Sequence, residues 1–182
     1  MASPVLTLLM SIFNMYLMIV VIRLWLQLVK ADFYNPFSQF TIKVTQPIVG
    51  PLRRIIPSVG PVDTATLVFA ILIAFAKVLT YQVISQGSFP PLLFAFVFSL
   101  SNLIYQVLWL IFIIIIIRAI LSWVSQGSHP VEMVMGQLTE PLLRPIRKIV
   151  PAIGGLDLSV LVFLLGLQFI ISVFSSAFGP FI

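Results

Sequence analysis

The chain has 182 residues, of which 60% are hydrophobic and only 8% are charged, and its mean hydropathy is +1.18. This composition excludes a soluble globular domain, in which about 25% of the residues are charged. Ten Lys and Arg residues against five Asp and Glu give a net charge of +5, and there is no cysteine. Disulfide frameworks, thiolate nucleophiles and zinc–thiolate sites are therefore excluded as well.

Four apolar stretches are long enough to cross a membrane, for which a helix needs about 20 residues. They cover residues 5–29, 65–84, 102–124 and 158–178. They lack the alternation of barrel strands, and helices satisfy their own backbone in lipid. The sequence therefore predicts an all-α membrane protein with four transmembrane helices. Because no positive charge precedes the first stretch, we expect it to be a span rather than a signal peptide.

The segment after the first stretch begins with a turn, residues 32–36, that carries interfacial aromatic side chains. Phe37, Phe40, Thr41 and Val44 then share one face of a short amphipathic helix, which we expect to lie in the membrane interface. The segment after the third stretch has Val131, Val134, Met135 and Leu138 at the matching positions.

Prolines follow at positions 47, 51 and 57 and again at 141, 145 and 151. The first proline of each set suits the first turn of a helix, and the second would interrupt a continuing helix. We therefore predict two short pieces with a bend. Gly60 and Gly154 permit the turn back into the membrane, and Asp63 and Asp157 are candidate N-caps of the next spans.

The proline-rich block occurs twice, because residues 47–63 return without a gap at residues 141–157. Each copy lies between two apolar stretches. The sequence thus predicts two tandem repeats, residues 1–88 and 89–182, each built as span, short amphipathic and proline-rich segment, span. Residues 90–100 add apolar length between the halves. Either the third span begins early and tilts, or residues 91–98 form a separate interfacial piece.

Nine of the ten basic residues lie in the two surface segments or at the span ends that lead into them; Lys77 is the exception. The positive-inside bias places both segments in the cytoplasm and both termini outside, so the repeats are parallel. Charges so close to spans favour anionic lipid headgroups over nucleic acid as their partner. The candidate lipid- or partner-binding residues are Arg53, Arg54, Arg144, Arg147 and Lys148.

Arg23 and Arg118 come just before the cytoplasmic ends of the first and third spans. They either extend to the headgroups or form buried ion pairs, Arg23 with Asp63 and Arg118 with Asp157. The first alternative is favoured on sequence alone.

Lys77 is the one charge inside a predicted span, and a charge there suggests an ion pathway. Asn14 and Gln168 are further candidates to line it. The second half has Ile171 where the first has Lys77, so the repeat does not require the charge, and ordinary interhelical hydrogen bonds are the favoured explanation of such polar residues.

The sequence lacks a phosphate-binding glycine loop and a nucleophile elbow, and its lone histidine, His129, lies in a His-Pro turn. All five acidic residues fall in the surface segments. We therefore expect no enzyme activity, no catalytic or metal site and no cofactor.

Two segments resemble the YggT family of small integral membrane proteins: DFYNPFSQ at residues 32–39 and EPLLRPIRK at residues 140–148. The likeness extends over nearly the whole chain. It implies a bacterial inner-membrane protein with relatives in plastids and with no firmly assigned activity. Members of the family have been associated with osmotic or envelope stress and with potassium uptake, and the resemblance supplies no catalytic residues.

Two functional hypotheses follow. The first is a non-enzymatic protein of the bacterial inner membrane that organises the membrane under osmotic or envelope stress by binding lipid and protein partners, including a second copy of itself, at the cytoplasmic face. The second is a small ion channel or transporter component, for example in potassium uptake.

Overall fold

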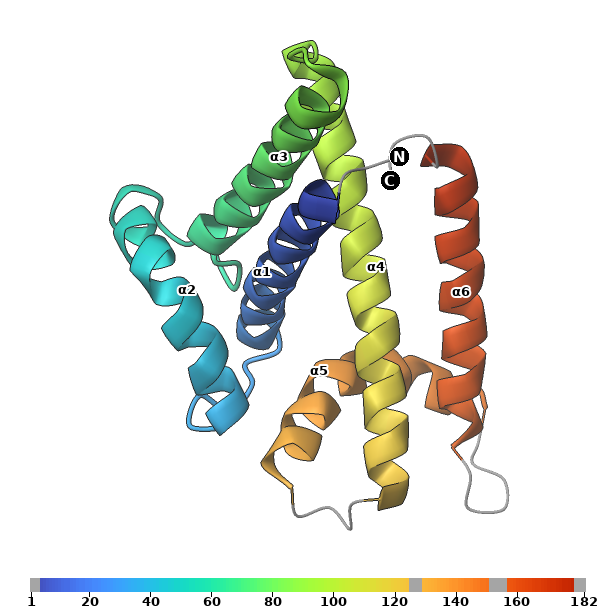
Figure 1. Cartoon of the computed structure of the whole chain (residues 1–182). Coiled ribbons are helices and arrows are strands. Elements are labelled where there is room, and N and C mark those ends of the chain that lie inside the picture. Colours follow the sequence, from blue (N-terminus) through green and yellow to red (C-terminus); the bar gives the residue numbers. More distant parts are fainter. Residues whose placement is uncertain (1–3, 125–128, 151–156, 179–182) are drawn as a thin grey trace.

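The computed structural model describes residues 4–124, 129–150 and 157–178 (Figure 1). Over these residues the chain forms six helices: α1 (Pro4–Leu28), α2 (Pro36–Ile55), α3 (Thr64–Gln86), α4 (Leu92–Val124), α5 (Pro130–Arg147) and α6 (Leu158–Phe178). Four of them, α1, α3, α4 and α6, are long and apolar enough to cross a membrane. The all-helical prediction is confirmed, and the four long apolar helices indicate a membrane protein.

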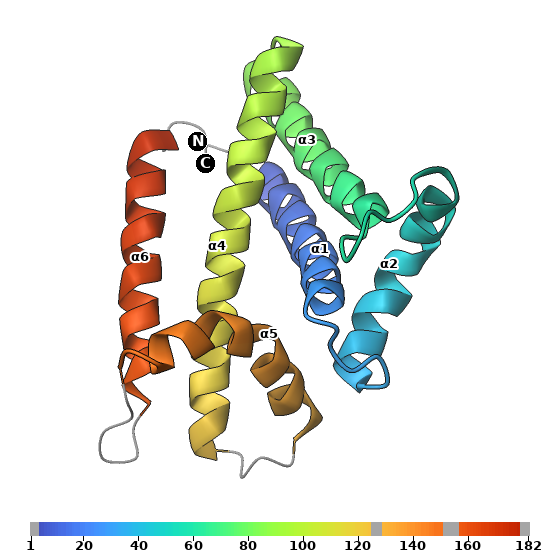
Figure 2. The same ribbon diagram turned by 180° about the vertical axis from the view of Figure 1, so that it is seen from behind.

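The long helices alternate in direction: α1 and α4 run downward in Figure 1, and α3 and α6 run upward. Helix α2 links the end of α1 to the start of α3, and α5 links the end of α4 to the start of α6. The two connecting helices therefore lie at the same end of the long helices, and they contact each other. Helix α4 lies centrally, packed against α3 and α6 (Figures 1 and 2).

The core lies between α1, α3 and α4. Leu17 and Val20 of α1 are fully buried, as are Ala70 and Ala74 of α3, whose small side chains allow the two helices to approach closely. The ring of Tyr16 meets that of Phe69 edge to face, with 6.0 Å between the centroids. Large apolar side chains elsewhere on the four long helices face outward, as in a helix surrounded by lipid.

Helix α4 starts at Leu92, so residues 92–100 continue the third span instead of forming a separate piece. Its 33 residues extend about 50 Å at a rise of 1.5 Å per residue. Since the hydrocarbon core is only about 30 Å thick, α4 must tilt or project beyond it.

The predicted break at the second proline of each segment is wrong. Helix α2 continues through Pro47 and Pro51, and α5 continues through Pro141 and Pro145. Each proline removes a single intrahelical hydrogen bond, and packing of α2 against α1 and α3 sustains the helix through that loss. The effect of the prolines is a bend, which is visible in α5 (Figure 2).

The two connecting helices bury different kinds of side chain. The expected apolar positions Val134, Met135 and Leu138 of α5 are buried. In α2 the buried side consists instead of Ser38, Thr41, Thr45 and Val49, and Phe40 is 54% exposed. The protein-facing side of α2 is thus largely polar, which positions hydroxyl groups next to the end of α1.

Asn35 holds the start of α2 against the start of α5. Its side-chain oxygen accepts a hydrogen bond from the Phe37 amide (3.0 Å), and its side-chain nitrogen donates to the Pro130 carbonyl (2.7 Å). His129 caps α5 in the same way, because its Nδ1 accepts from the Val131 amide at 3.3 Å. The lone histidine is therefore an N-cap in an exposed turn.

The chain returns from α2 to α3 through a tight turn in which Val59 and Val62 exchange backbone hydrogen bonds of 3.1 Å. Gly60 adopts a left-handed conformation there (φ 58°), as the sequence predicts. The corresponding Gly154 lies outside the described residues.

Replacement of Asn35 by Ala is expected to destabilise the protein by about 2 kcal/mol, because it removes an N-cap and the hydrogen bond to the Pro130 carbonyl. Asn35→Asp keeps the cap acceptor and loses only the donor, so it should cost about half as much. Denaturant unfolding of the purified protein in detergent measures both. Equal stability of the two variants would show that the cap contributes nothing, and an Asn35→Asp variant as stable as the original protein would show that the bond to Pro130 contributes nothing.

Candidate functional site

Two clusters of arginine side chains lie where the long helices meet the connecting helices. We define the first arginine cluster as Arg23, Thr45, Gln46, Arg53 and Asp63. The second arginine cluster consists of Arg118, Thr139, Glu140, Arg147 and Asp157.

Arg23 of α1 is only 1% exposed, although it carries a charge. Its Nη1 donates a hydrogen bond to Thr45 Oγ1 (2.6 Å) and its Nη2 donates to Gln46 Oε1 (2.8 Å), both on α2. Its Nε is buried and donates to no protein atom among the described residues. Neutral groups alone thus solvate this buried guanidinium directly.

Arg53 of α2 binds Asp63, the N-cap of α3. The Arg53 Nη2 lies 2.5 Å from Asp63 Oδ2, and its Nε donates to the same oxygen at 3.1 Å. The other carboxylate oxygen accepts from the Thr66 amide (3.4 Å), and the Thr66 hydroxyl donates to Oδ2. With its amide oriented to satisfy both neighbours, Gln27 donates to Asp63 and accepts from Arg53.

These contacts keep Asp63 ionised. Its burial acts to raise the pKa of the carboxyl, but the hydrogen bonds from Arg53 and Thr66 and the positive charge of Arg53 outweigh burial and lower the pKa below its ordinary value.

The second arginine cluster contains one more carboxylate. Arg118 of α4 donates from Nη1 to Thr139 Oγ1 and from Nη2 to Glu140 Oε2 (3.2 Å). Arg147 donates to Glu140 at 3.0 Å and 3.1 Å and to Asp157 at 2.9 Å. Glu140 therefore lies between two guanidiniums.

The carboxyl groups of Glu140 and Asp157 show the same balance as Asp63. Burial acts to raise each pKa, and the hydrogen bonds and charges around them outweigh it. The pKa of Glu140 is lowered by Arg118 and Arg147, and that of Asp157 by Ser159 and Arg147.

The two clusters share the same arrangement of arginine, threonine and aspartate but differ in charge at one position. Thr45, Arg53 and Asp63 return 94 residues later as Thr139, Arg147 and Asp157, but Gln46 returns as Glu140. The first cluster thus holds two guanidiniums and one carboxylate, and the second holds two of each. Sequence reasoning overlooked both threonines and position 46, although their spacing in the repeated segment was a usable signal.

The expected ion pairs of Arg23 with Asp63 and of Arg118 with Asp157 are wrong. Asp63 binds Arg53, and Asp157 binds Arg147. The turn after α2 brings Asp63 back to Arg53 in the last turn of that helix, and Asp157 contacts Arg147 in the last turn of α5. Arg23 and Arg118 instead contact Thr45 and Thr139, about two helical turns earlier. Extension to the headgroups is wrong for Arg23 too, because protein encloses it.

Of the five predicted lipid-binding residues, three are exposed and have side chains without a hydrogen bond or ion pair within the described part of the chain: Arg54, Arg144 and Lys148. The other two, Arg53 and Arg147, are held by carboxylates. Exposed apolar side chains adjoin the available cations, since Ile55 and Ile149 are each 80% exposed.

The residues expected to line an ion pathway do not all come together. Lys77 Nζ donates to Asn102 Oδ1 (2.6 Å), joining α3 to α4. One turn further along α4, Gln106 donates to the backbone carbonyl of Asn14 (2.9 Å). Gln168 lies on an exposed face of α6, which packs against α4 and α5. Over the described ranges no group of three or more His, Asp or Glu side chains could hold a metal ion.

In the described residues the chain has six helices, and the four long apolar ones, with the two arginine clusters at one end, indicate a small helical membrane protein. The CCB3/YggT family model matches residues 2–84 and again residues 97–178. This chain belongs to the CCB3/YggT family, as its sequence resemblance predicts.

The relatives carry names without an assigned activity. The chain is 52% identical over 171 residues to an uncharacterized protein of Vibrio alginolyticus, which covers 93% of this chain and 92% of the relative. It is 45% identical over 159 residues to the uncharacterized protein YggT of Escherichia coli K12, covering 87% and 82% of the two chains. An uncharacterized Pseudomonas aeruginosa protein is 44% identical over 164 residues, covering 86% and 81%. No solved structure matches.

The contacts of Asp63 predict how two substitutions differ. Asp63→Asn keeps the cap of α3 but removes the charge. Because 37% of the Arg53 side chain stays exposed and water screens the pair, we expect a loss of about 1 kcal/mol. Asp63→Ala also removes the cap and should cost about 1 kcal/mol more. Denaturant unfolding in detergent at pH 7 measures both losses.

Acid should remove the same stabilisation. Since folding lowers the pKa of Asp63, Glu140 and Asp157, their contribution is present above the unfolded values of about 3.9 to 4.3 and is lost as pH falls through the lower folded values. Unfolding measured from pH 6 to pH 2 should show this loss, and Asp63→Asn should reduce it. An unchanged acid profile in Asp63→Asn would contradict the assignment.

Proposed function

We propose that this protein is a non-enzymatic protein of the bacterial inner membrane that organises the membrane under osmotic or envelope stress. It does so by binding anionic lipid and protein partners at its cytoplasmic face. The observation that carries the proposal is the pairing of unpartnered cations with exposed isoleucines at the ends of α2 and α5: Arg54 adjoins Ile55, and Lys148 adjoins Ile149. Such pairs suit an interface in which the cation meets headgroups and the apolar side chain meets acyl chains.

The proposed topology places both connecting helices in the cytoplasm and both termini outside, with the halves as parallel repeats. Three observations support it. Nine of ten basic residues lie in or next to the connecting segments, the family model matches the chain twice, and the alternating directions of the long helices put α2 and α5 at one end.

Replacing Arg54, Arg144 and Lys148 together by Gln should weaken binding of anionic phospholipid at least ten-fold, because each basic residue near the surface contributes about 1 kcal/mol. Native mass spectrometry of the detergent-purified protein with phosphatidylglycerol and phosphatidylcholine measures the preference. The charge-preserving variant Arg54→Lys with Arg144→Lys is the control and should bind as the original does. Unchanged preference in the triple Gln variant would refute the lipid contact.

The cellular role has its own test. Cells that lack the protein should survive osmotic downshift less well, and the triple Gln variant, expressed at equal level, should fail to restore survival. Full restoration by that variant would detach the stress role from these cations.

A channel or transporter component, for example in potassium uptake, is the second candidate. The hydrogen bonds of Lys77 with Asn102 and of Gln106 with Asn14 support it, because they line up polar groups between α1, α3 and α4. In liposomes, Lys77→Leu should then abolish cation flux, whereas Gln168→Leu on the outer face of α6 should leave it intact. Absence of flux from the unaltered protein would dispose of this candidate.

A further inference from the structure

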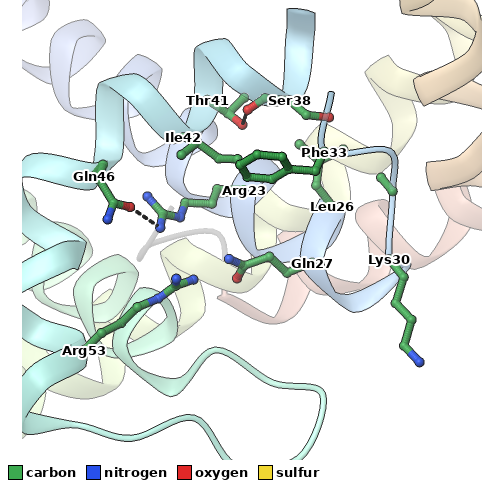
Figure 3. A pocket seen from close by; sticks show the side chains of 11 residues that line it. Arg23, Leu26, Gln27, Lys30, Phe33, Ser38, Thr41, Ile42, Gln46 and Arg53 are labelled. Carbon is green, nitrogen blue, oxygen red and sulfur yellow. Dashed lines mark hydrogen bonds between the residues drawn. The ribbon is translucent and has the colours of Figure 1, made fainter. Parts of the chain in front are cut away.

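A pocket of about 300 Å³ opens beside Arg23, between the end of α1 and the inner side of α2. Figure 3 shows the guanidinium groups of Arg23 and Arg53 and the amides of Gln27 and Gln46 gathered around the same space, with the ring of Phe33 on another side. The volume lies at the small end of the range of ligand pockets, about 300–1,000 Å³. It suits a small polar group rather than a large ligand.

The polar lining of the pocket carries positive charge without an acidic counterpart. Its charged and polar members include Arg23, Gln27, Lys30, Ser38, Gln46 and Arg53. Two carboxylates lie near the three cations of the lining. Asp63 is bound by Arg53 and by Thr66 at the N-terminus of α3, and Asp32, between the lining residues Ala31 and Phe33, accepts a hydrogen bond from the Tyr34 amide. The pocket side of the cluster thus retains a net positive charge.

Two buried polar atoms of the lining have no partner in the described chain. They are the Nε of Arg23 and the hydroxyl oxygen of Ser38, and their residues are 1% and 3% exposed. A buried charge is costly unless it is paired and its donors are used. The arrangement therefore calls for an anion that accepts hydrogen bonds.

The second arginine cluster shows how the same charge is neutralised within the protein. Arg118 binds Glu140, whereas Arg23 binds the neutral amide of Gln46 at the equivalent position. At this position the first cluster thus lacks the carboxylate that the second has. An external anion at the first cluster would supply what Glu140 supplies at the second.

We propose that the pocket between α1 and α2 binds a phosphate group, which supplies the missing negative charge beside Arg23. Guanidinium groups pair well with phosphate because their N–H donors match two of its oxygens. The guanidinium of Arg53 faces the same space as that of Arg23 (Figure 3).

The source of the phosphate is either a phospholipid headgroup or free phosphate. Arg23 lies five residues before the end of α1, about 7.5 Å along the helix axis, which is the depth of a headgroup in the topology proposed above. Apolar side chains of Leu26, Ile42 and Phe33 also line the pocket and suit the glycerol and upper acyl region. The lipid source rests on the proposed function; phosphate binding itself does not.

The test measures thermal unfolding of the full-length protein in a maltoside detergent, which contains no phosphate. Sodium phosphate is added in one arm and short-chain phosphatidylglycerol in the other, each against sodium chloride of equal ionic strength. A saturable rise of the midpoint in the lipid arm alone identifies a headgroup site, and a rise in the phosphate arm identifies a site for the free anion. No rise in either arm overturns the proposal.

Gln46→Glu is the decisive variant, because it gives Arg23 the carboxylate that Arg118 already has. We expect it to unfold at a higher temperature than the original protein without ligand and to bind the effective ligand at least ten-fold more weakly. Ser58→Glu adds the same charge on an exposed turn outside the pocket and should respond as the original does. If the ligand raises the unfolding midpoint of Gln46→Glu as much as that of the original protein, the proposal is overturned.

The triple Gln variant of Arg54, Arg144 and Lys148 separates this pocket from the surface lipid contacts. None of its substituted residues lines the pocket. It should keep the ligand-dependent rise of the midpoint even if it loses its preference for anionic lipid. If the triple Gln variant loses the ligand-dependent rise of the unfolding midpoint and Gln46→Glu keeps it, the exposed cations bind the ligand, and the proposal of a phosphate site in the pocket is overturned.

Discussion

The aspartate that begins a long helix also binds the arginine that ends the connecting helix before it, and this double contact fixes the architecture. Asp63 caps α3 and holds Arg53, so the direction of α2 is set relative to α3. Asp157 and Arg147 repeat the arrangement between α5 and α6. Because a helix N-terminus favours negative charge and the arginine favours the same carboxylate, one side chain satisfies two demands. The same arginine–aspartate contact thus joins each connecting helix to the long helix that follows it.

The arginines of the long helices, Arg23 and Arg118, fix each connecting helix against the long helix that precedes it. Arg23 and Arg118 come from the long helices α1 and α4 and contact the connecting helices at a threonine in both halves. Each threonine hydroxyl also donates to a carbonyl one turn earlier, Thr45 to Thr41 and Thr139 to Met135, so its lone pairs are free to face the guanidinium. This bond fixes the connecting helix against the long helix before it, and the aspartate fixes it against the long helix after it. Arginine contacts thus hold each connecting helix at its middle and at its C-terminal end.

Much of the fold could be predicted from the sequence, and the failures have physical causes. Length and hydropathy identified the four long helices, and Asp63 and Gly60 were recognised because caps and left-handed turns have strong residue preferences. The prediction that the helix breaks at Pro51 is wrong because tertiary packing stabilises a helix that local residue preference would end. The predicted partner of Arg23 is wrong because sequence spacing does not show which face of α1 contacts α2. Residues such as Thr45 and Gln46, ordinary in themselves, acquire their role only once that face is known.

The single exchange at Gln46 and Glu140 has a consequence for the behaviour of the two halves. A carboxylate within the chain neutralises Arg118 under all conditions in which it stays ionised, so the second half is electrostatically complete by itself. In the first half the Arg23 guanidinium is only 1% exposed and contacts neutral amide and hydroxyl groups. Further stabilisation of its charge depends on an anion from outside the chain. A ligand that binds only the folded state stabilises it in proportion to the logarithm of its concentration. If an anion occupies this pocket, the stability of α1 against α2 therefore follows the supply of that anion, whereas the packing of α4 against α5 does not.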